Sequence, residues 1–141
     1  MIKTDKDYQE AQAKLADEEF AIEETKKRLK EEGIPDEVAK NILDPLTSFH
    51  LQLKEEVETY ERIRDGKIDP VSSFKALGRS LIAMRIASGM SQLELANAIG
   101  TTQPVVNRFE RNEYHGAKKE LIDKVTEALG FETTISFKRV G

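Results

Sequence analysis

Residues 92–111 read QLELANAIGTTQPVVNRFER and carry the features of two short helices that cross at a fixed angle. Ala96 is small where the two helices must approach closely, and Gly100 permits the positive φ of a tight turn between them. Apolar side chains on both helices are expected to face inward and hold this angle, namely Leu95, Ile99, Val106 and Phe109. These residues predict a helix-turn-helix.

The second helix of the pair has polar side chains on its outer face, close to its first turn. We expect Gln103, Pro104, Asn107 and Arg108 to lie there. This part of such a helix can enter the major groove, where Gln can bond adenine bidentately and Arg can bond the O6 and N7 of guanine. Pro104 can only touch a thymine methyl, and Asn107 can instead point to a phosphate or to solvent. We predict that these four residues contact DNA bases.

Residues on both sides of the pair extend the pattern. They are Leu77-Gly78, Leu81, Met84-Arg85, Gly89-Met90-Ser91-Gln92, Leu95-Ala96, Ile99-Gly100, Gln103, Val106, Arg108-Phe109-Glu110-Arg111 and Leu129-Gly130. With these residues the segment resembles the Cro and cI repressor (XRE-type) helix-turn-helix family, so we expect a lambda-repressor-like bundle. Asn112 stands where that family usually has Gly, and Asn tolerates the left-handed conformation of a helix C-cap.

The resemblance also implies roles for individual side chains. Arg85 and Glu110 occupy the positions of a structural ion pair that ties the first helix of the bundle to the recognition helix. Gln92 would contact a phosphate and brace Gln103. His115 can be a phosphate contact or simply a turn residue. The full set that we predict to contact phosphates is Gln92, Thr102, Arg111, His115, Lys118 and Lys119.

Residues 1–68 predict an acidic antiparallel helical hairpin, which we interpret as a dimerisation or partner-binding arm. Thr4 with Asp7 has the form of a helix N-cap. A narrow apolar seam then recurs every seven residues, at Tyr8, Leu15, Ile22 and Leu29. A second helical region supplies a richer face, made by Ile42, Leu46, Phe49, Leu53, Val57, Tyr60 and Ile63. Asp44-Pro45 predicts that this region is two helices, about 36–43 and 45–65, that meet at a bend.

The C-terminal half predicts short helices followed by a strand. Asp69-Pro70 is expected to open the first of four helices that extend to Gly130. From Phe131 onward, apolar and polar residues alternate, which predicts a β-strand over 131–141. The predicted fold is therefore mainly α: a hairpin at 1–68, a helix-turn-helix bundle at 69–130 and one C-terminal strand.

Composition and charge narrow the possible functions. The 141 residues include no Cys and only 2 His, so we expect no disulfide, metal or cofactor. No arrangement of residues suggests an enzyme, and the absence of a signal peptide or membrane span predicts a cytoplasmic protein. Residues 1–68 carry 12 Lys and Arg against 18 Asp and Glu, whereas residues 69–141 carry 10 against 8. If either half binds nucleic acid, it is therefore the C-terminal half.

The favoured function is a homodimeric repressor that binds double-stranded DNA at an inverted-repeat operator. The lone strand could pair with its copy across a two-fold axis and place two recognition helices about 34 Å apart; residues 1–3 or another protein are alternative strand partners. The layout also resembles HigA-like antitoxins, which cover a small basic toxin and regulate their own operon. A third hypothesis is a helical scaffold that does not bind DNA.

Overall fold

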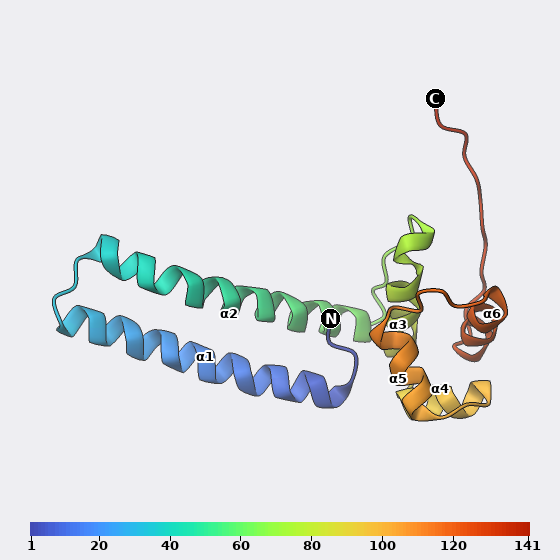
Figure 1. Ribbon diagram of the computed structural model, residues 1–141, viewed down its shortest axis with the longest axis horizontal. Helices are drawn as coiled ribbons and strands as arrows, with labels where there is room; N and C mark the ends of the chain where they lie inside the picture. Colours follow the sequence, from blue (N-terminus) through green and yellow to red (C-terminus); the bar gives the residue numbers. More distant parts are fainter. The chain divides into compact units, whose positions relative to one another are not determined.

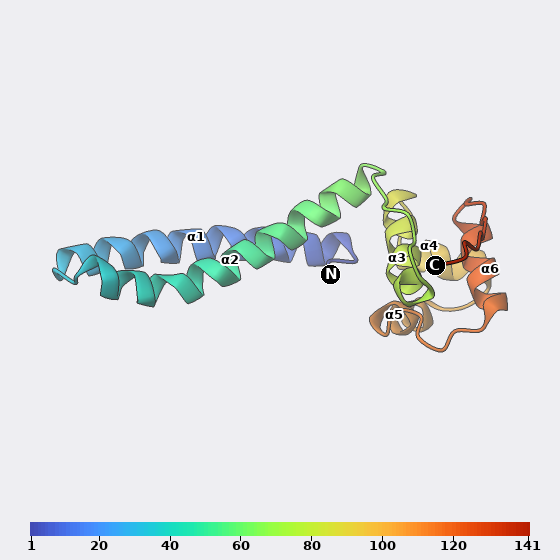
Figure 2. The same ribbon diagram turned by 90° about the horizontal axis from the view of Figure 1, so that it is seen from above.

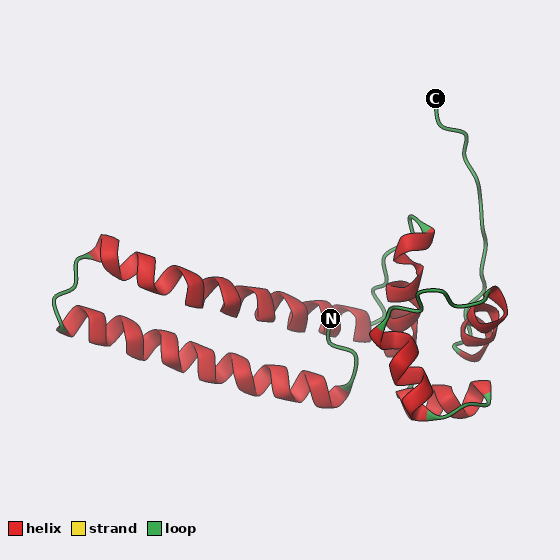
Figure 3. Cartoon of the chain, viewed as in Figure 1, coloured by secondary structure: helices red, strands yellow, loops and turns green.

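The computed structural model describes residues 1–141, and its only regular secondary structure is helical, with no strand (Figures 1 and 3). The chain divides into two compact units, Met1–Glu61 and Arg62–Gly141. No helix is both long enough and apolar enough to span a membrane. The helices are α1 (Asp5–Glu31), α2 (Asp36–Arg64), the short 3-10 helix η1 (Phe74–Ala76), α3 (Leu77–Ala87), α4 (Gln92–Ile99), α5 (Gln103–Arg111) and α6 (Lys119–Ala128).

Helices α1 and α2 lie side by side as the predicted hairpin (Figures 1 and 2). The hydroxyl of Thr4 accepts the amide of Asp7 at 3.1 Å and so caps α1. Contacts between the helices join early residues of α1 to late residues of α2, which makes the pair antiparallel. The rings of Tyr8 and Tyr60 stack at 5.0 Å, and the hydrogen-bonded pairs are Tyr8 with Glu61, Tyr60 with Asp5 and His50 with Glu18.

The predicted bend at Asp44-Pro45 is not a helix boundary, because α2 continues through Pro45. The proline ring removes only one backbone hydrogen bond of the helix. On both sides of it the helix carries apolar residues that are partly covered, namely the half-buried Leu43 and Leu53. Packing on both sides therefore outweighs the local interruption, and the prediction of two helices was wrong.

Asp69-Pro70 also does not begin a helix. Residues 65–73 contain no helix, and the first helical turn after them is η1. The carboxylate of Asp69 instead lies 3.2 Å from the guanidinium of Arg62. The Asp69 carboxylate thus pairs with a residue that precedes it in the chain, and no helix begins at Pro70.

The second unit has a small core to which each of its four α-helices contributes. Helix α3 supplies Leu81 and Ile82, α4 supplies Leu95, α5 supplies Val106 and α6 supplies Val125, and none of these side chains is more than 1% exposed. This core fixes α4 and α5 against each other and against α3 and α6.

The β-strand predicted at 131–141 is absent, and this prediction was wrong for the single chain. A strand requires a neighbouring strand for its backbone hydrogen bonds, and the rest of the chain forms none. Residues 131–141 have no regular secondary structure, and their apolar side chains remain open to solvent, with Ile135 61%, Phe137 86% and Val140 95% exposed.

Candidate nucleic-acid interface

Helix α4 is closed at both ends by local interactions. At its start the Ser91 hydroxyl accepts the amide of Glu94 at 3.1 Å, while the Ser91 amide donates to the Glu94 carboxylate at 2.7 Å. The Ser91 amide and then its hydroxyl lower the pKa of Glu94 below its ordinary value of 4.5. At its end Gly100 has φ 76°, a left-handed conformation that an L side chain rarely adopts. The chain therefore turns sharply into α5.

The turn places α5 across α4 in a helix-turn-helix. The Thr101 amide donates to the Ala96 carbonyl at 2.9 Å, and Thr102 is the extended N-cap residue of α5. Pro104 lies in the first turn, where its missing amide hydrogen costs no helical bond. Ala96 and Val106 are fully buried between the helices. The small residue and the glycine thus act as the sequence predicted.

An ion pair inside the domain joins α3 to α5. The Nε of Arg85 donates to one carboxylate oxygen of Glu110 at 2.5 Å, and Nη2 donates to the other at 2.9 Å. The two side chains are 3% and 0% exposed. Arg85 also donates to the Met90 carbonyl at 2.9 Å, in the loop before α4. Both charges are therefore paired and hydrogen-bonded, as burial requires.

A line of side-chain hydrogen bonds leads from this ion pair to the surface of α5. Gln92 Nε2 donates to Glu110 at 2.7 Å, and Asn107 Nδ2 donates to Gln92 Oε1 at 3.3 Å. Arg111 Nη2 then donates to Asn107 Oδ1 at 3.0 Å. Glu110 and Gln92 are buried, Asn107 is half-buried and Arg111 is exposed. The line thus crosses the domain from its core to its outer face.

The turn after α5 is left-handed at two residues that are not glycine. Asn112 has φ −100°, so it is not the left-handed cap that we expected; the positive values belong to Glu113, φ 54°, and Tyr114, φ 56°. The Tyr114 ring stacks on Phe109 at 5.8 Å, and Glu113 pairs with Arg79 at 2.9 Å. Burial, and then the charge of Glu110, raise the pKa of Tyr114 well above its ordinary value. Tertiary contacts therefore hold the turn.

Residues 81–135 match the helix-turn-helix family model. They are a helix-turn-helix domain of the Cro and cI repressor (XRE) type. The comparisons with curated proteins and with solved structures find no match. A helix-turn-helix domain of this type implies DNA as a partner.

The predicted base-contacting residues of the helix-turn-helix domain do not share one environment. Gln103, Pro104 and Arg108 are exposed, and neither Gln103 nor Arg108 has a side-chain hydrogen bond or ion pair within the chain. Asn107 differs, because both ends of its amide are engaged by Gln92 and Arg111. Gln103, Pro104 and Arg108 are therefore available to a ligand without any rearrangement.

The predicted phosphate-contacting residues also divide. One set is exposed: Thr102, Arg111, His115, Lys118 and Lys119. Lys118 is the N-cap residue of α6 and Lys119 is its first residue. Gln92 is only 4% exposed, and its amide bonds Glu110 and Asn107, with no bond to Gln103. The sequence analysis singled out Gln92 but did not predict its hydrogen-bond partners Glu110 and Asn107, which lie on α5.

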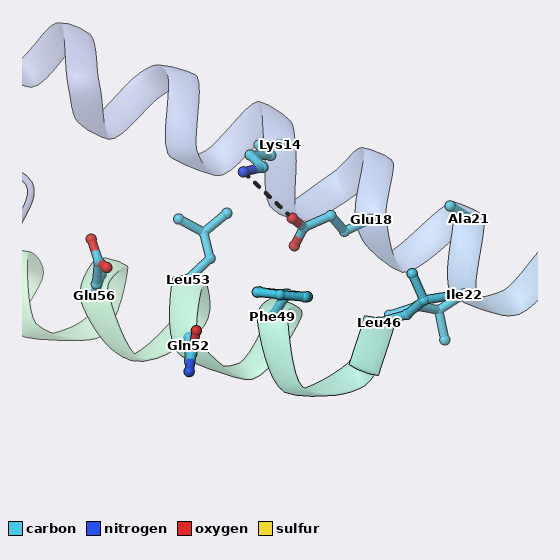
Figure 4. A pocket seen from close by; sticks show the side chains of 9 residues that line it. All are labelled: Lys14, Glu18, Ala21, Ile22, Leu46, Phe49, Gln52, Leu53 and Glu56. Atoms are coloured by element: carbon cyan, nitrogen blue, oxygen red, sulfur yellow. Dashed lines mark ion pairs between the residues drawn. The ribbon is translucent and has the colours of Figure 1, made fainter. Parts of the chain in front are cut away.

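The hairpin contains a groove that the sequence analysis did not predict. It has a volume of about 380 Å³ and opens between α1 and α2, as Figure 4 shows. Ile22 contributes to its apolar wall from α1, and Leu46, Phe49 and Leu53 contribute from α2. Phe49 is 67% exposed there. The apolar repeat of α2 could have indicated this groove, because it has more apolar residues than the narrow seam of α1 can cover.

Proposed function

We propose that the protein is a sequence-specific DNA-binding transcriptional regulator, acting as a homodimeric repressor of an inverted-repeat operator. The observation that carries this proposal is the exposed face at the start of α5. Gln103 and Arg108 lie there without intramolecular partners, on a helix fixed from behind by the Arg85–Glu110 ion pair. Both are side chains that recognise base edges in the major groove.

The residues at the start and on the outer face of α5 would read bases. We assign this role to Gln103, Pro104 and Arg108. The exposed residues around them would hold the DNA backbone and set the register of the helix without reading sequence. These are Thr102, Arg111, His115, Lys118 and Lys119. Gln92 is buried with both ends of its amide bonded, so we assign it to the support of α5.

Two copies would read the two halves of the operator. A two-fold axis would place the recognition helices about 34 Å apart, one turn of DNA. The exposed apolar side chains on the hairpin and on residues 131–141 are surface that a second copy could cover. Sedimentation of the free protein and of its DNA complex tests this part. A monomer that binds a single half-site with full affinity would contradict the dimer.

Two variants test the DNA proposal with a site selected from random duplexes. Arg108→Ala should relax the preference at one base position by about 1–3 kcal/mol, because one bidentate contact is lost. Lys118→Ala should weaken binding to all duplexes alike and reduce the salt slope by about 1, because one phosphate contact is lost. Equal losses that do not depend on salt for both variants would overturn the proposal.

The groove of the hairpin favours a second candidate function, that of an antitoxin. Residues 1–68 have 18 acidic against 12 basic side chains, and Phe20, Leu46 and Phe49 are exposed on them. An acidic surface with uncovered apolar side chains suits a small basic protein such as a toxin. The same chain would then also regulate its own operon through α5.

A separation-of-function pair tests the antitoxin role. The probe is the product of an adjacent reading frame that encodes a basic protein, coexpressed and copurified with this chain. Phe49→Asp should abolish copurification and leave DNA binding intact, whereas Arg108→Ala should leave copurification intact and relax the base preference. Copurification that survives Phe49→Asp would place the partner elsewhere, and a basic neighbour that never copurifies would remove this candidate.

A further inference from the structure

We propose that Asn107 is a positioning residue that orients Arg111 against the DNA backbone, and that it does not read a base. This inference rests on the proposed DNA-binding function and refines it. It is carried by the line of hydrogen bonds from Glu110 through Gln92 and Asn107 to Arg111.

The donors and acceptors along this line of hydrogen bonds can be arranged in only one way, and the buried carboxylate of Glu110 sets the arrangement. Glu110 is paired with Arg85 and, as an anion, can only accept hydrogen bonds. Gln92 must therefore turn its NH₂ group toward Glu110, which leaves the oxygen Oε1 facing Asn107. The orientation of the Gln92 amide is thus imposed by the core of the domain.

The same logic fixes the amide of Asn107. Because Gln92 presents an oxygen, Asn107 must present its NH₂ group, and the distance between Nδ2 and Oε1 is 3.3 Å. The oxygen Oδ1 then faces outward and accepts from Arg111 Nη2 at 3.0 Å. An arginine one turn later on the helix is the donor that this oxygen requires.

Both of these bonds fix the orientation of the Asn107 amide, so a base-reading role would have to turn the amide and break them or use only its second N–H and second lone pair. Bidentate recognition of adenine uses the oxygen and the NH₂ group of Asn together. In Asn107 these are the two groups that hold Gln92 and Arg111. Arg111, by contrast, is exposed, and its remaining donors can reach a phosphate. Asn107 therefore acts on DNA through Arg111.

The DNA arm of the test compares variants on a selected duplex and on single-base variants of it. Asn107→Ala should weaken binding to all of them by the same factor, roughly 2- to 10-fold, the effect of one hydrogen bond. In an Arg111→Ala background the same change should have no further effect. The matched control is Asn97→Ala, an exposed Asn on α4 without a side-chain hydrogen bond, which should bind like the wild type. A changed preference at one base position, or a loss that persists without Arg111, would overturn the proposal.

The second arm uses the free protein and does not depend on DNA. Hydrogen exchange of the side-chain amide protons should be slower for Asn107 than for Asn97, because only Asn107 donates to a neighbour. Equal exchange would show that the line of hydrogen bonds does not form and would overturn the proposal. If exchange is slow but the wild type binds no selected duplex, the proposed DNA-binding function fails, and the role of Asn107 in positioning Arg111 against DNA fails with it.

Discussion

Gly78 on α3 packs directly against the backbone of Glu113: a β-carbon at position 78 would overlap the Glu113 carbonyl group. Glu113 is one of the two residues other than glycine that have positive φ in the turn after α5. The first helix of the bundle thus reaches the end of the recognition helix through a contact between backbones, in addition to the Arg85–Glu110 ion pair.

Gly78→Ala should destabilise the protein although alanine favours helices. The propensity gain is about 1 kcal/mol, whereas overpacking against a backbone carbonyl costs about 1–3 kcal/mol and leaves little room to relax. Urea unfolding measures the difference. Ser80→Ala on the same helix is the control and should change the free energy of unfolding much less. A Gly78→Ala variant more stable than the wild type would contradict the close approach.

Removing one partner of the buried ion pair should be costly. Arg85→Ala leaves Glu110 charged and buried, and we expect the free energy of unfolding to fall by about 3–5 kcal/mol. The double variant Arg85→Met, Glu110→Met leaves no stranded charge and should lie closer to the wild type than either single variant. Denaturant unfolding of the wild type, Arg85→Met, Glu110→Met and the double variant checks this, and additive losses would argue against the pairing.

Tyr114 should make the protein less stable in alkali. Its pKa is raised in the folded state above the ordinary value of 10.0, so above about pH 10 the unfolded chain releases this proton while the folded chain retains it. The free energy of unfolding should therefore fall as the pH rises past 10. Tyr114→Phe keeps the ring beside Phe109 and removes this component. A difference between the two proteins that does not change with pH would contradict the prediction.

Glu94 should contribute to acid sensitivity in the opposite direction. Its pKa is lowered by the Ser91 amide and then by the Ser91 hydroxyl, so its stabilising effect is complete above the ordinary pKa of 4.5. It is lost as the pH falls below that value, through the pKa of the folded state. The stability difference between the wild type and Glu94→Ala should therefore shrink toward low pH. Thermal unfolding at several pH values measures it, and a constant difference would rule out the carboxylate bond.

The features that the sequence predicted best are those that neighbouring residues determine. Thr4 and Asp7 are three residues apart, and the Thr4 hydroxyl accepts the Asp7 amide and caps α1. Gly100 adopts its positive φ in the turn, and Ala96 is buried where α4 meets α5. The cap and the turn can be inferred from residue type and spacing, because the residues that form them lie within one turn of the chain. The burial of Ala96 follows from the turn, which brings α5 back across α4.

The features that were missed depend on groups distant in sequence or on packing. Pro45 locally predicts a helix boundary, but α2 continues through it because the helix packs on both sides. The alternation of apolar and polar residues after Phe131 predicts a strand, but it does not show whether a second strand is present to accept its backbone hydrogen bonds. The hydrogen bond of Asn107 to Gln92 was not predicted, because Gln92 is fifteen positions earlier on another helix. Residue type alone cannot indicate which polar groups such a partner will occupy.

The bare backbone of residues 131–141 has a practical consequence. Proteases bind their substrates in an extended conformation and cut helices slowly. Trypsin should therefore cut early after Lys138 and Arg139, which lie in a segment without secondary structure. A brief digestion would trim this end and spare the helical remainder. The rate of this cleavage then reports binding to the segment, because the rate should fall when DNA, a second copy or another protein covers residues 131–141.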